Sequence, residues 1–370
     1  MDPAAPHLID ATMFWNRSGG VRRYIEAKRG WLHAHTDWRH TVATPRPEGD
    51  GAFSVPSLPL PGSDGSYRWA WRRSATAQAL CAAAPDLIEA ADPYRLAWSA
   101  LDAARALGIP AVAFCHSNLE RMAALAAGRW HLGAERAARR YAAHLYERFD
   151  LVLAPSAAML AHLNDWGVSN AEHQPLGVDT RVFNPQRRHP AWRRSIGLPD
   201  DARILVYAGR FAPEKHLATL AAATGRLGAG HWLVAIGAGP APPAGERVRV
   251  LPPIAHAITL STALASADVY VHAGDQETFG LSALEALACG LPVVARATEG
   301  LAELIDDRVG HGVHADTPQA FADAVAEILA REPRTLRDAA RARALQHDWE
   351  QVVPRLYQRY RRLMRAHARR

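Results

Sequence analysis

The sequence predicts an α/β protein made of two doubly wound domains, each with a parallel sheet covered by helices. Two observations predict this class. The length of 370 residues exceeds what one typical hydrophobic core organises, and short apolar runs alternate with alanine- and leucine-rich helical stretches. With 49% hydrophobic and 22% charged residues, the composition is that of an ordinary globular protein. A fibrous or disordered class is therefore excluded.

Apolar runs of strand length recur in both halves, and each is followed by helix-like or turn-like sequence. In the first half the predicted strands are His7–Met13, Asp86–Ala90, Ala111–Cys115 and Leu151–Ala154. In the second half they are Ile204–Ala208, Trp232–Ile236, Val248–Leu251, Val269–His272 and Pro292–Ala295. Because ligands bind outside the carboxyl ends of parallel strands, function is expected in the loops that follow these runs.

A polar, proline-bearing stretch between the halves predicts the domain boundary. We interpret residues 175–201 as an exposed linker. The predicted division is an N-terminal domain over 1–177, a second domain over 178–345, and a C-terminal helix over 346–370 that packs back toward the first domain. The functional site is predicted in the cleft between the domains. Residues 45–61, rich in Pro, Gly and Ser, are predicted to form a surface loop.

Bulk features limit the compartment and the partners. Cys81, Cys115 and Cys289 are far apart and form no CxxC pair, which argues against a disulfide framework or a zinc site. The start of the chain lacks a signal-like pattern, and no run reaches the ~20 apolar residues of a membrane span. We therefore expect a cytoplasmic protein. The net charge of +6 is compatible with nucleic acid, anionic lipid or an anionic substrate, and separates none of them.

Only two of the 43 basic residues are lysines, Lys28 and Lys215, so each lysine is informative. Lys215 lies in the run AGRFAPEKH, directly after a predicted strand. Gly209 permits a tight turn there, so Arg210 and Lys215 can converge on one anion such as a diphosphate. The alternative is an ordinary strand-to-helix loop with solvated charges.

The motif DQETFGLSALEALACGLP follows another predicted strand. Gly280, Leu281 and Ser282 are predicted to form a first helical turn, whose free N–H groups can bind phosphate or sugar oxygens. Glu285 lies about one turn further along, where its carboxylate can accept hydrogen bonds from paired ribose hydroxyls. Glu277 precedes the helix and can reach the hydroxyls of a sugar. Helix capping by acidic residues is the alternative.

Weaker candidates lie at strand ends in the first half. Gly19 and Gly20 follow the first predicted strand, where the backbone can approach a ligand or simply turn. His116 follows the strand AVAFC, and its imidazole can contact a sugar hydroxyl or move a proton, with a capping or core histidine as the alternative. The aromatic segment YRWAWRR at 67–73 can stack on sugars, but no role is assigned to it.

These motifs resemble glycosyltransferase family 4, a group of retaining enzymes with two Rossmann-like domains in the GT-B fold. The resemblance covers most of the chain and rests on GGVRRY, FCHSN, DLVLAPS, LGVDTRVFNP, GRFAPEKH and ETFGLSALEALACGLPVV. It implies that the N-terminal domain binds the acceptor and the second domain binds a nucleotide sugar.

The resemblance also implies roles for individual residues. Arg210 and Lys215 would hold the donor diphosphate, and Glu285 the ribose. Residues 251–254 would flank the base. The implied catalytic residues are His116, Arg210, Lys215 and Glu277. The implied donor-binding residues are Gly19, Gly20, Gly209, Phe279, Gly280, Leu281, Ser282 and Glu285.

The function implied by the resemblance is transfer of a hexose, with retention, from a nucleotide diphosphate sugar to a glycan, lipid or small-molecule hydroxyl. GDP-mannose is the favoured donor and a UDP-hexose the next, because the pattern looks closest to bacterial mannosyltransferase-like members. No cofactor is expected, and the absence of an Asp-x-Asp pair agrees with metal independence. The alternatives are another enzyme on this fold, such as a sugar-nucleotide epimerase, and a basic nucleic-acid-binding protein. The dispersed arginines disfavour nucleic acid as a partner.

Two basic helical stretches suggest peripheral contact with an anionic membrane, residues 21–35 and 353–370. The second stretch carries one apolar stripe, formed by Leu356, Tyr360, Leu363 and Met364. The favoured alternative is that this stripe packs into the protein core.

Overall fold

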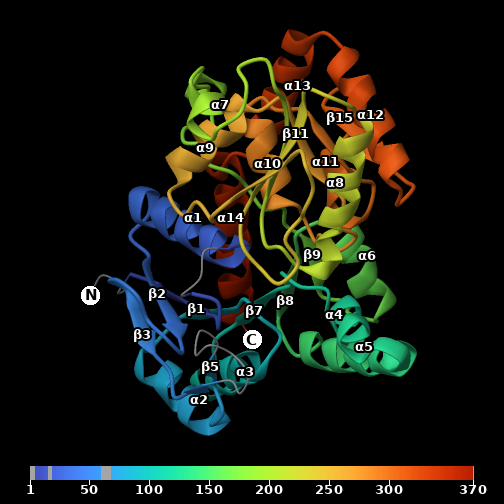
Figure 1. The fold of residues 1–370 in the computed structure, drawn as a ribbon. Helices are drawn as coiled ribbons and strands as arrows, with labels where there is room; N and C mark the ends of the chain where they lie inside the picture. Colours follow the sequence, from blue (N-terminus) through green and yellow to red (C-terminus); the bar gives the residue numbers. More distant parts are fainter. Residues whose placement is uncertain (1–4, 16–18, 60–67, 370) are drawn as a thin grey trace. The chain divides into compact units, whose positions relative to one another are not determined.

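The computed structural model of the protein describes residues 5–15, 19–59 and 68–369 (Figure 1). The chain forms two compact units. Unit 1 contains Met1–Pro175 together with Trp349–Arg370, and unit 2 contains Leu176–Asp348. The divisions therefore fall after 175 and after 348, where the sequence predicted them after 177 and after 345.

Unit 1 contains a parallel seven-stranded sheet in the order β3-β2-β1-β6-β7-β8-β9. Its strands are β1 (His7–Ala11), β2 (Arg39–Thr44), β3 (Ala52–Ser54), β6 (Leu87–Ala90), β7 (Ala111–Phe114), β8 (Leu151–Ala154) and β9 (Ala171–His173). Strands β1, β6, β7 and β8 are buried along their whole length, because helices cover both faces of a parallel sheet. The strand order reverses between β1 and β6, which makes the sheet doubly wound.

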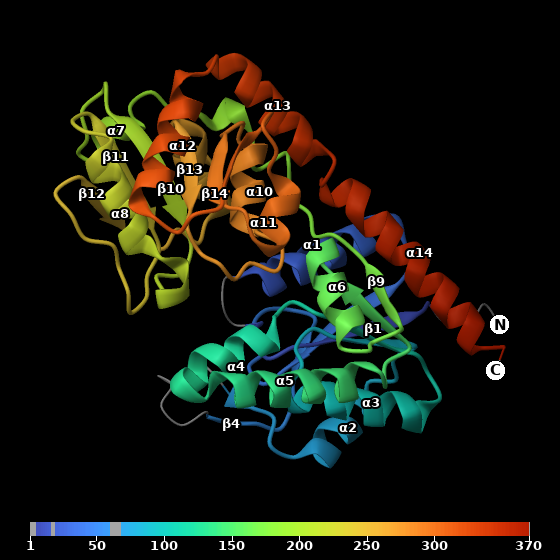
Figure 2. The ribbon, with the colours of Figure 1, turned by 90° about the vertical axis from the view of Figure 1, so that its right-hand side faces the viewer.

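Seven helices, one 3₁₀ turn and a two-stranded antiparallel ribbon complete the described part of unit 1 (Figure 2). The helices are α1 (Gly20–His35), α2 (Arg73–Ala82), α3 (Arg95–Leu107), α4 (Leu119–Ala127), α5 (His131–Tyr146), α6 (Ala157–Asp165) and α14 (Trp349–His367), with η1 at Gly128–Trp130. The ribbon pairs β4 (Leu58–Pro59) with β5 (Arg68–Trp69). Helix α14 packs against α1, and its residues Leu356 and Tyr360 are buried in unit 1.

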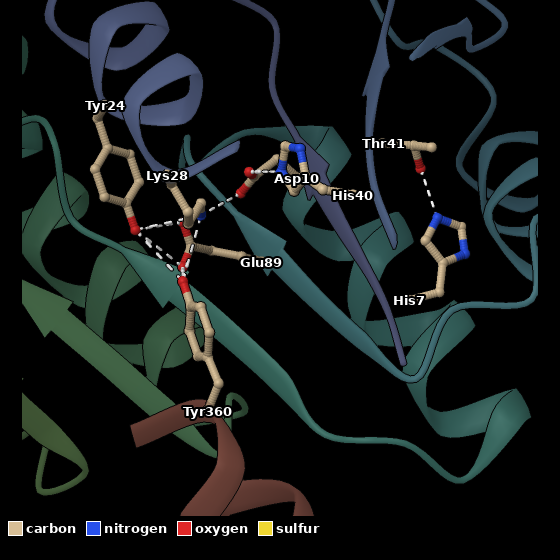
Figure 3. Close-up of polar contacts among 8 residues, drawn as sticks. All are labelled: His7, Asp10, Tyr24, Lys28, His40, Thr41, Glu89 and Tyr360. Atoms are coloured by element: carbon tan, nitrogen blue, oxygen red, sulfur yellow. Dashed lines mark hydrogen bonds and ion pairs between the residues drawn. The ribbon is translucent and has the colours of Figure 1, made fainter. Parts of the chain in front are cut away.

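A buried polar cluster ties α1 and α14 to the sheet of unit 1 (Figure 3). The Lys28 Nζ atom lies 2.8 Å from Asp10 Oδ1 and 2.7 Å from Glu89 Oε1. All three side chains are 0% exposed. Tyr360 of α14 and Tyr24 of α1 both donate hydrogen bonds to the Glu89 carboxylate. One ammonium group therefore faces two carboxylates in the interior of the unit.

Unit 2 contains a parallel six-stranded sheet in the order β12-β11-β10-β13-β14-β15. Its strands are β10 (Arg203–Ala208), β11 (His231–Ile236), β12 (Val248–Leu251), β13 (Val269–His272), β14 (Val293–Arg296) and β15 (Gly310–Val313). The order reverses between β10 and β13, so this sheet is doubly wound as well. The predicted α/β class with two Rossmann-like halves is confirmed.

Helices cover the sheet of unit 2 in two groups. Helices α8 and α12 pack together against it, while α10 packs with α9 and α13 (Figure 2). The helical elements are α7 (Trp192–Ser195), α8 (Leu217–Arg226), α9 (Ala257–Ser266), α10 (Leu281–Ala288), α11 (Glu299–Leu304), α12 (Pro318–Ala330) and α13 (Pro333–Leu345), with 3₁₀ turns η2 (Pro185–Arg187) and η3 (Pro213–Lys215).

Two predictions about irregular segments were wrong. Residues 175–201 are not an exposed linker, because Phe183 is buried and the Arg193 guanidinium forms a 2.8 Å ion pair with Asp268 inside unit 2. Residues 45–61 are not simply a surface loop, because β3 and β4 fall within their described part. Neither β2 nor β15 was predicted, since the first mixes polar and apolar residues and the second carries two glycines.

Candidate functional site

Two loops lie side by side at the carboxyl ends of β10 and β13, the neighbouring strands where the sheet of unit 2 reverses its order. Residues 209–216 follow β10, and residues 273–280 follow β13. The loop after β11 contacts the loop after β10, because the Phe211 amide donates a 2.8 Å hydrogen bond to the Ala238 carbonyl. Doubly wound sheets bind their ligands at this position. The residues of these loops are therefore the candidate site of unit 2.

Lys215 and Glu277 form an ion pair between the two loops. The Lys215 ammonium donates to Glu277 Oε1 and, over 3.3 Å, to the Gln276 carbonyl. His272, the last residue of β13, donates from Nε2 to the same carboxylate oxygen over 3.1 Å. The side chains of Lys215 and Glu277 are 11% and 22% exposed, so the pair lies at the edge of the protein interior. An ammonium group has three donors, and one remains for a ligand.

The environment of Glu277 keeps this carboxyl ionised. Burial opposes ionisation, but the Lys215 ammonium and the hydrogen bond from His272 outweigh it and hold the pKa of Glu277 well below its usual range. A carboxylate held by two donors is a strong hydrogen-bond acceptor. Both donors contact Oε1, so Oε2 can still accept a hydrogen bond, while the lowered pKa makes the carboxylate a weak nucleophile.

Arg210 lies in the same loop as Lys215 but pairs differently. Its guanidinium is 71% exposed and lies 3.1 Å from Glu214. In this structure the two cations contact different carboxylates, and their convergence on one anion stays a prediction. An exposed ion pair contributes little free energy, so a diphosphate could replace Glu214 at small cost.

Close backbone approaches between the loops require glycine at positions that were not predicted. A Cβ atom on Gly237 would lie 1.9 Å from the Gly209 carbonyl oxygen, and one on Gly239 would lie 2.3 Å from the Phe211 carbonyl oxygen. A Cβ atom on Gly274 would lie 2.8 Å from the His272 ring. The signal in the sequence is the GAG triplet after the strand ending at Ile236.

The start of α10 is shaped by the segment that begins α11. Gly280 has φ 92° and precedes the helix, and no side chain caps the first turn. The Gly300 amide donates a 3.0 Å hydrogen bond to the Glu277 carbonyl. A Cβ atom on Gly300 would lie 2.4 Å from the Phe279 Cα atom, so only glycine fits at this position. The loop is thereby fixed, and the amides of the first turn remain to bind an anion.

The side chains of α10 differ in what they offer a ligand. The Ser282 hydroxyl lies 2.7 Å from the Tyr270 hydroxyl, so the backbone amide of Ser282 is what this residue can offer. Glu285 lies one turn further along α10 and is 3% exposed. Leu281 is the first residue of the helix. These placements agree with the predicted geometry of the motif, while the roles stay predictions.

The remaining predicted residues belong to unit 1. Gly20 is the first residue of α1, and a Cβ atom on Gly19 would meet no atom of a described residue within 4 Å. His116 follows β7, and its ring stacks on Phe114 with centroids 4.2 Å apart. Burial, followed by the charge of Lys28, lowers the pKa of His116 to about 3. The lowered pKa favours a neutral imidazole near pH 7, and the role of His116 stays a prediction.

A buried carboxyl that was not predicted lies at the strand reversal of unit 1. Asp92 follows β6, is 3% exposed, and accepts a 2.7 Å hydrogen bond from the Met13 amide through Oδ2. Burial raises the pKa of Asp92 to about 7, although the Met13 amide and the Thr12 hydroxyl oppose the shift. A carboxyl that titrates near neutrality can exchange a proton with a hydroxyl.

Comparisons with known proteins bear on both units. Residues 18–182 match the family described as Glycosyltransferase Family 4, and residues 189–346 match the family described as Glycosyl transferases group 1. The chain is 32% identical to a GDP-mannose-dependent alpha-mannosyltransferase of Mycolicibacterium smegmatis, over 75% of this chain and 73% of that protein. It is 34% identical to a GDP-mannose-dependent alpha-(1-6)-phosphatidylinositol dimannoside mannosyltransferase of Mycobacterium tuberculosis, over 73% of this chain and 72% of that protein.

A solved structure shares the fold of the whole chain. Sucrose-phosphate synthase from Thermosynechococcus elongatus matches with a TM-score of 0.82 at 22% identity, over 98% of this chain and 100% of that one. Fold and sequence together define an enzyme of the glycosyltransferase class with the GT-B fold. The chain belongs to glycosyltransferase family 4, as the motifs indicated.

Among the described residues there is neither a cluster of metal-binding side chains nor a helix suited to span a membrane. No group of three or more His, Cys, Asp or Glu side chains is arranged to hold a metal ion. No described helix combines the length and the apolar character that crossing a bilayer requires.

Proposed function

We propose that this enzyme transfers mannose from GDP-mannose to a hydroxyl acceptor with retention at the anomeric carbon, without a metal or other cofactor. The observation that carries the proposal is the Lys215–Glu277 ion pair at the strand reversal of unit 2, beside the uncapped start of α10. Two relatives that match over about three quarters of this chain are named as GDP-mannose-dependent mannosyltransferases. A UDP-hexose is the alternative donor.

The chemistry follows from the charges of the site. Departure of GDP places negative charge on the diphosphate, and Lys215, Arg210 and the first amides of α10 stabilise that charge. One well-aimed donor contributes ~3–4 kcal/mol to such a transition state. Glu277 binds hydroxyls of the transferred sugar rather than attacking it, because Lys215 and His272 engage its carboxylate. Same-face substitution by the acceptor hydroxyl is therefore the mechanism we favour.

A ligand-dependent melting experiment tests the donor assignment. A ligand that binds only the folded protein adds about 2.7 kcal/mol at a hundred times its Kd. We expect GDP-mannose to raise the melting temperature more than UDP-glucose or ADP-glucose does, and Lys215→Ala to reduce that rise. A larger rise with a UDP-sugar would overturn the choice of GDP-mannose. No rise with any nucleotide sugar would overturn the site.

We further propose a cytoplasmic enzyme that contacts an anionic membrane through the tip of the α4–α5 hairpin. The stretches 21–35 and 353–370 are less suited to such contact, because Lys28 of α1 and Leu356 and Tyr360 of α14 are buried. At the hairpin tip, by contrast, Trp130 is 70% exposed and Leu132 is 63% exposed, with Arg136 one turn away. Exposed aromatic and apolar side chains beside arginines are typical of interfacial contacts.

Vesicle sedimentation tests the membrane proposal. We expect low-salt binding to vesicles containing phosphatidylglycerol, weaker binding to pure phosphatidylcholine, and at least a fivefold loss in Trp130→Ala. The matched control is Ile258→Ala, which removes an apolar side chain that is 39% exposed in unit 2. Equal binding by the Trp130 variant, or none by the wild type, would remove the hairpin from the proposal.

A further inference from the structure

The outer strands of the sheet in unit 1 end at a cavity that the donor chemistry does not use. The cavity has a volume of about 480 Å³. Pro45, Arg46 and Pro47 reach it directly after β2, and Ser57 reaches it shortly after β3. Arg68, in the β4–β5 ribbon, also lines it. The cavity therefore lies beyond the carboxyl ends of the outer strands β2 and β3, away from the strand reversal between β1 and β6.

The cavity is positively charged. Among the described residues that line it, two are arginines and none is acidic. Glu48, the nearest carboxylate along the chain, is engaged elsewhere, because it lies 3.1 Å from the Arg22 guanidinium. Two guanidinium groups facing one solvent-filled space favour an anionic ligand over a neutral one.

One of the two guanidinium groups is fixed in position. Arg68 donates from Nε to the Ser57 hydroxyl over 3.0 Å and from Nη2 to the Ser57 carbonyl over 2.9 Å. Ser57 is the only described hydrogen-bond partner of this side chain, so other N–H donors of the guanidinium remain. Prolines at 45 and 47 restrict the neighbouring backbone and lower the entropy cost of binding.

Arg46 has a different character. Its side chain is exposed, and it has no hydrogen bond or ion pair with any described residue. Since no partner in the fold needs this charge, replacing Arg46 has little structural consequence. Arg46 therefore offers a clean test of whether the cavity binds an anion.

We propose that the Arg46–Arg68 cavity binds a phosphate group of the acceptor. A phosphate suits two guanidinium groups better than a carboxylate does, because it presents more oxygen acceptors. This inference rests on the proposed glycosyl transfer for the identity of the ligand as an acceptor. The cavity and its charge do not depend on that transfer.

The strand order indicates how long such an acceptor is. Strand β2, which leads to Arg46, is separated from β7, which leads to His116, by three inter-strand steps in the order β2-β1-β6-β7. At about 4.8 Å a step, the two strand ends are ~14 Å apart. An acceptor whose hydroxyl reacts near His116 would thus carry its phosphate beyond the reach of one hexose ring. A glycosylated lipid phosphate or an oligosaccharide phosphate has this form.

Phosphorus NMR on the full-length protein tests the proposal directly. The probes are methyl phosphate, a monoester like a sugar phosphate, and dimethyl phosphate, a diester like a lipid headgroup. Each is measured with excess GDP, which occupies the donor site. We expect the wild type to broaden the resonance of at least one ester. Arg46→Ala should reduce the broadening at least threefold, while Arg105→Ala, an exposed arginine on α3, should not.

The same spectra separate the two proposals. Broadening of the GDP resonances reports the donor site, and we expect it to be unchanged by Arg46→Ala. Stronger broadening of methyl phosphate would indicate a soluble phosphomonoester acceptor, and stronger broadening of dimethyl phosphate a lipid phosphate. The proposal is overturned if the wild type broadens neither ester, or if Arg46→Ala broadens them as the wild type does. If the wild type broadens an ester resonance but not the GDP resonances, the donor site is overturned and the phosphate cavity is not.

Discussion

The two lysines of this chain occupy contrasting sites in the two units. Lys28 of α1 is fully buried between Asp10 of β1 and Glu89 of β6 in unit 1. Lys215 is 11% exposed and lies at the carboxyl edge of the sheet of unit 2, against Glu277. Both lysines form ion pairs with carboxylates, but only the pair of Lys215 and Glu277 lies where a ligand can reach it. Solvent exposure distinguishes the two sites, because the Lys28 side chain is 0% exposed and the Lys215 side chain borders solvent.

The two carboxylates around Lys28 also show what one buried cation can compensate. Burial favours the neutral form of Asp10, but the charge of Lys28 and the hydrogen bond from His40 together outweigh it and lower the pKa to about 2. For Glu89 burial dominates, with the Asp10 charge adding to it, and the pKa rises to about 7. One ammonium group thus keeps one carboxylate ionised and leaves the other close to neutrality. Among the residues that the structure describes, Glu277 is the only carboxylate in an ion pair with Lys215.

The largest expected effect comes from removing the buried lysine. Lys28→Ala leaves Asp10 without a countercharge in the interior, so we expect the free energy of unfolding to fall by about 3–5 kcal/mol. Urea denaturation followed by circular dichroism measures it, with Arg105→Ala as the control for losing an exposed cation. A fall in the free energy of unfolding below about 1 kcal/mol would show that the buried cluster around Lys28 does not stabilise unit 1.

Glu277→Gln removes the carboxylate of the edge pair and keeps its shape. We expect turnover to fall about a hundredfold, corresponding to ~2.7 kcal/mol, because the sugar loses a charged acceptor and Lys215 loses its anchor. The melting temperature should change by only a few degrees, since the pair borders solvent. Release of GDP from GDP-mannose provides the assay. Unchanged turnover would place Glu277 among structural residues with Glu89.

Glu89→Gln is expected to change the pH dependence of stability. The pKa of Glu89 is raised in the folded state, so its contribution is fully present below about pH 4.5 and is lost as pH rises toward 7. We expect wild-type unit 1 to lose roughly 1–3 kcal/mol over this range and the variant to lose less. Urea denaturation at pH 4.5, 6 and 7.5 measures the difference. Equal slopes for both proteins would contradict the raised pKa.

A smaller effect is expected at the ribose position. Glu285→Gln should raise the KM for the donor about tenfold, or ~1.4 kcal/mol, with little change in kcat, because a ribose contact is made equally in ground and transition states. Glu327→Gln, on the exposed face of α12, is the control. A fall in kcat at constant KM would instead place Glu285 in the chemical step.

Much of the fold was predictable because its central strands are continuous apolar runs. Strands β8 and β13 were predicted with the bounds that the structure shows, and so was the partly exposed edge strand β12. Strands β2 and β15 carry no such run, and their position depends on pairing with β1 and β14, which the sequence does not reveal. The packing of residues 175–201 likewise depends on the distant Asp268.

The candidate site was predictable where a residue is rare or belongs to a motif. Lys215 is one of two lysines, and Glu277 and Glu285 belong to one motif. His272 was not predicted, because it is one of 18 histidines and ends an apolar strand. Its contact with Glu277 exists only after the loop folds back over β13. The pairing of Arg210 with Glu214 also depends on the folded loop rather than on spacing.

The contrast between the two lysines is tested most directly by turnover of Lys215→Ala at saturating GDP-mannose. GDP release is measured alongside the free energy of unfolding of the same variant. We predict that turnover falls at least tenfold while the free energy of unfolding stays within about 1 kcal/mol of the wild type. Near-normal turnover in a folded Lys215→Ala protein would contradict the account and remove Lys215 from the chemistry.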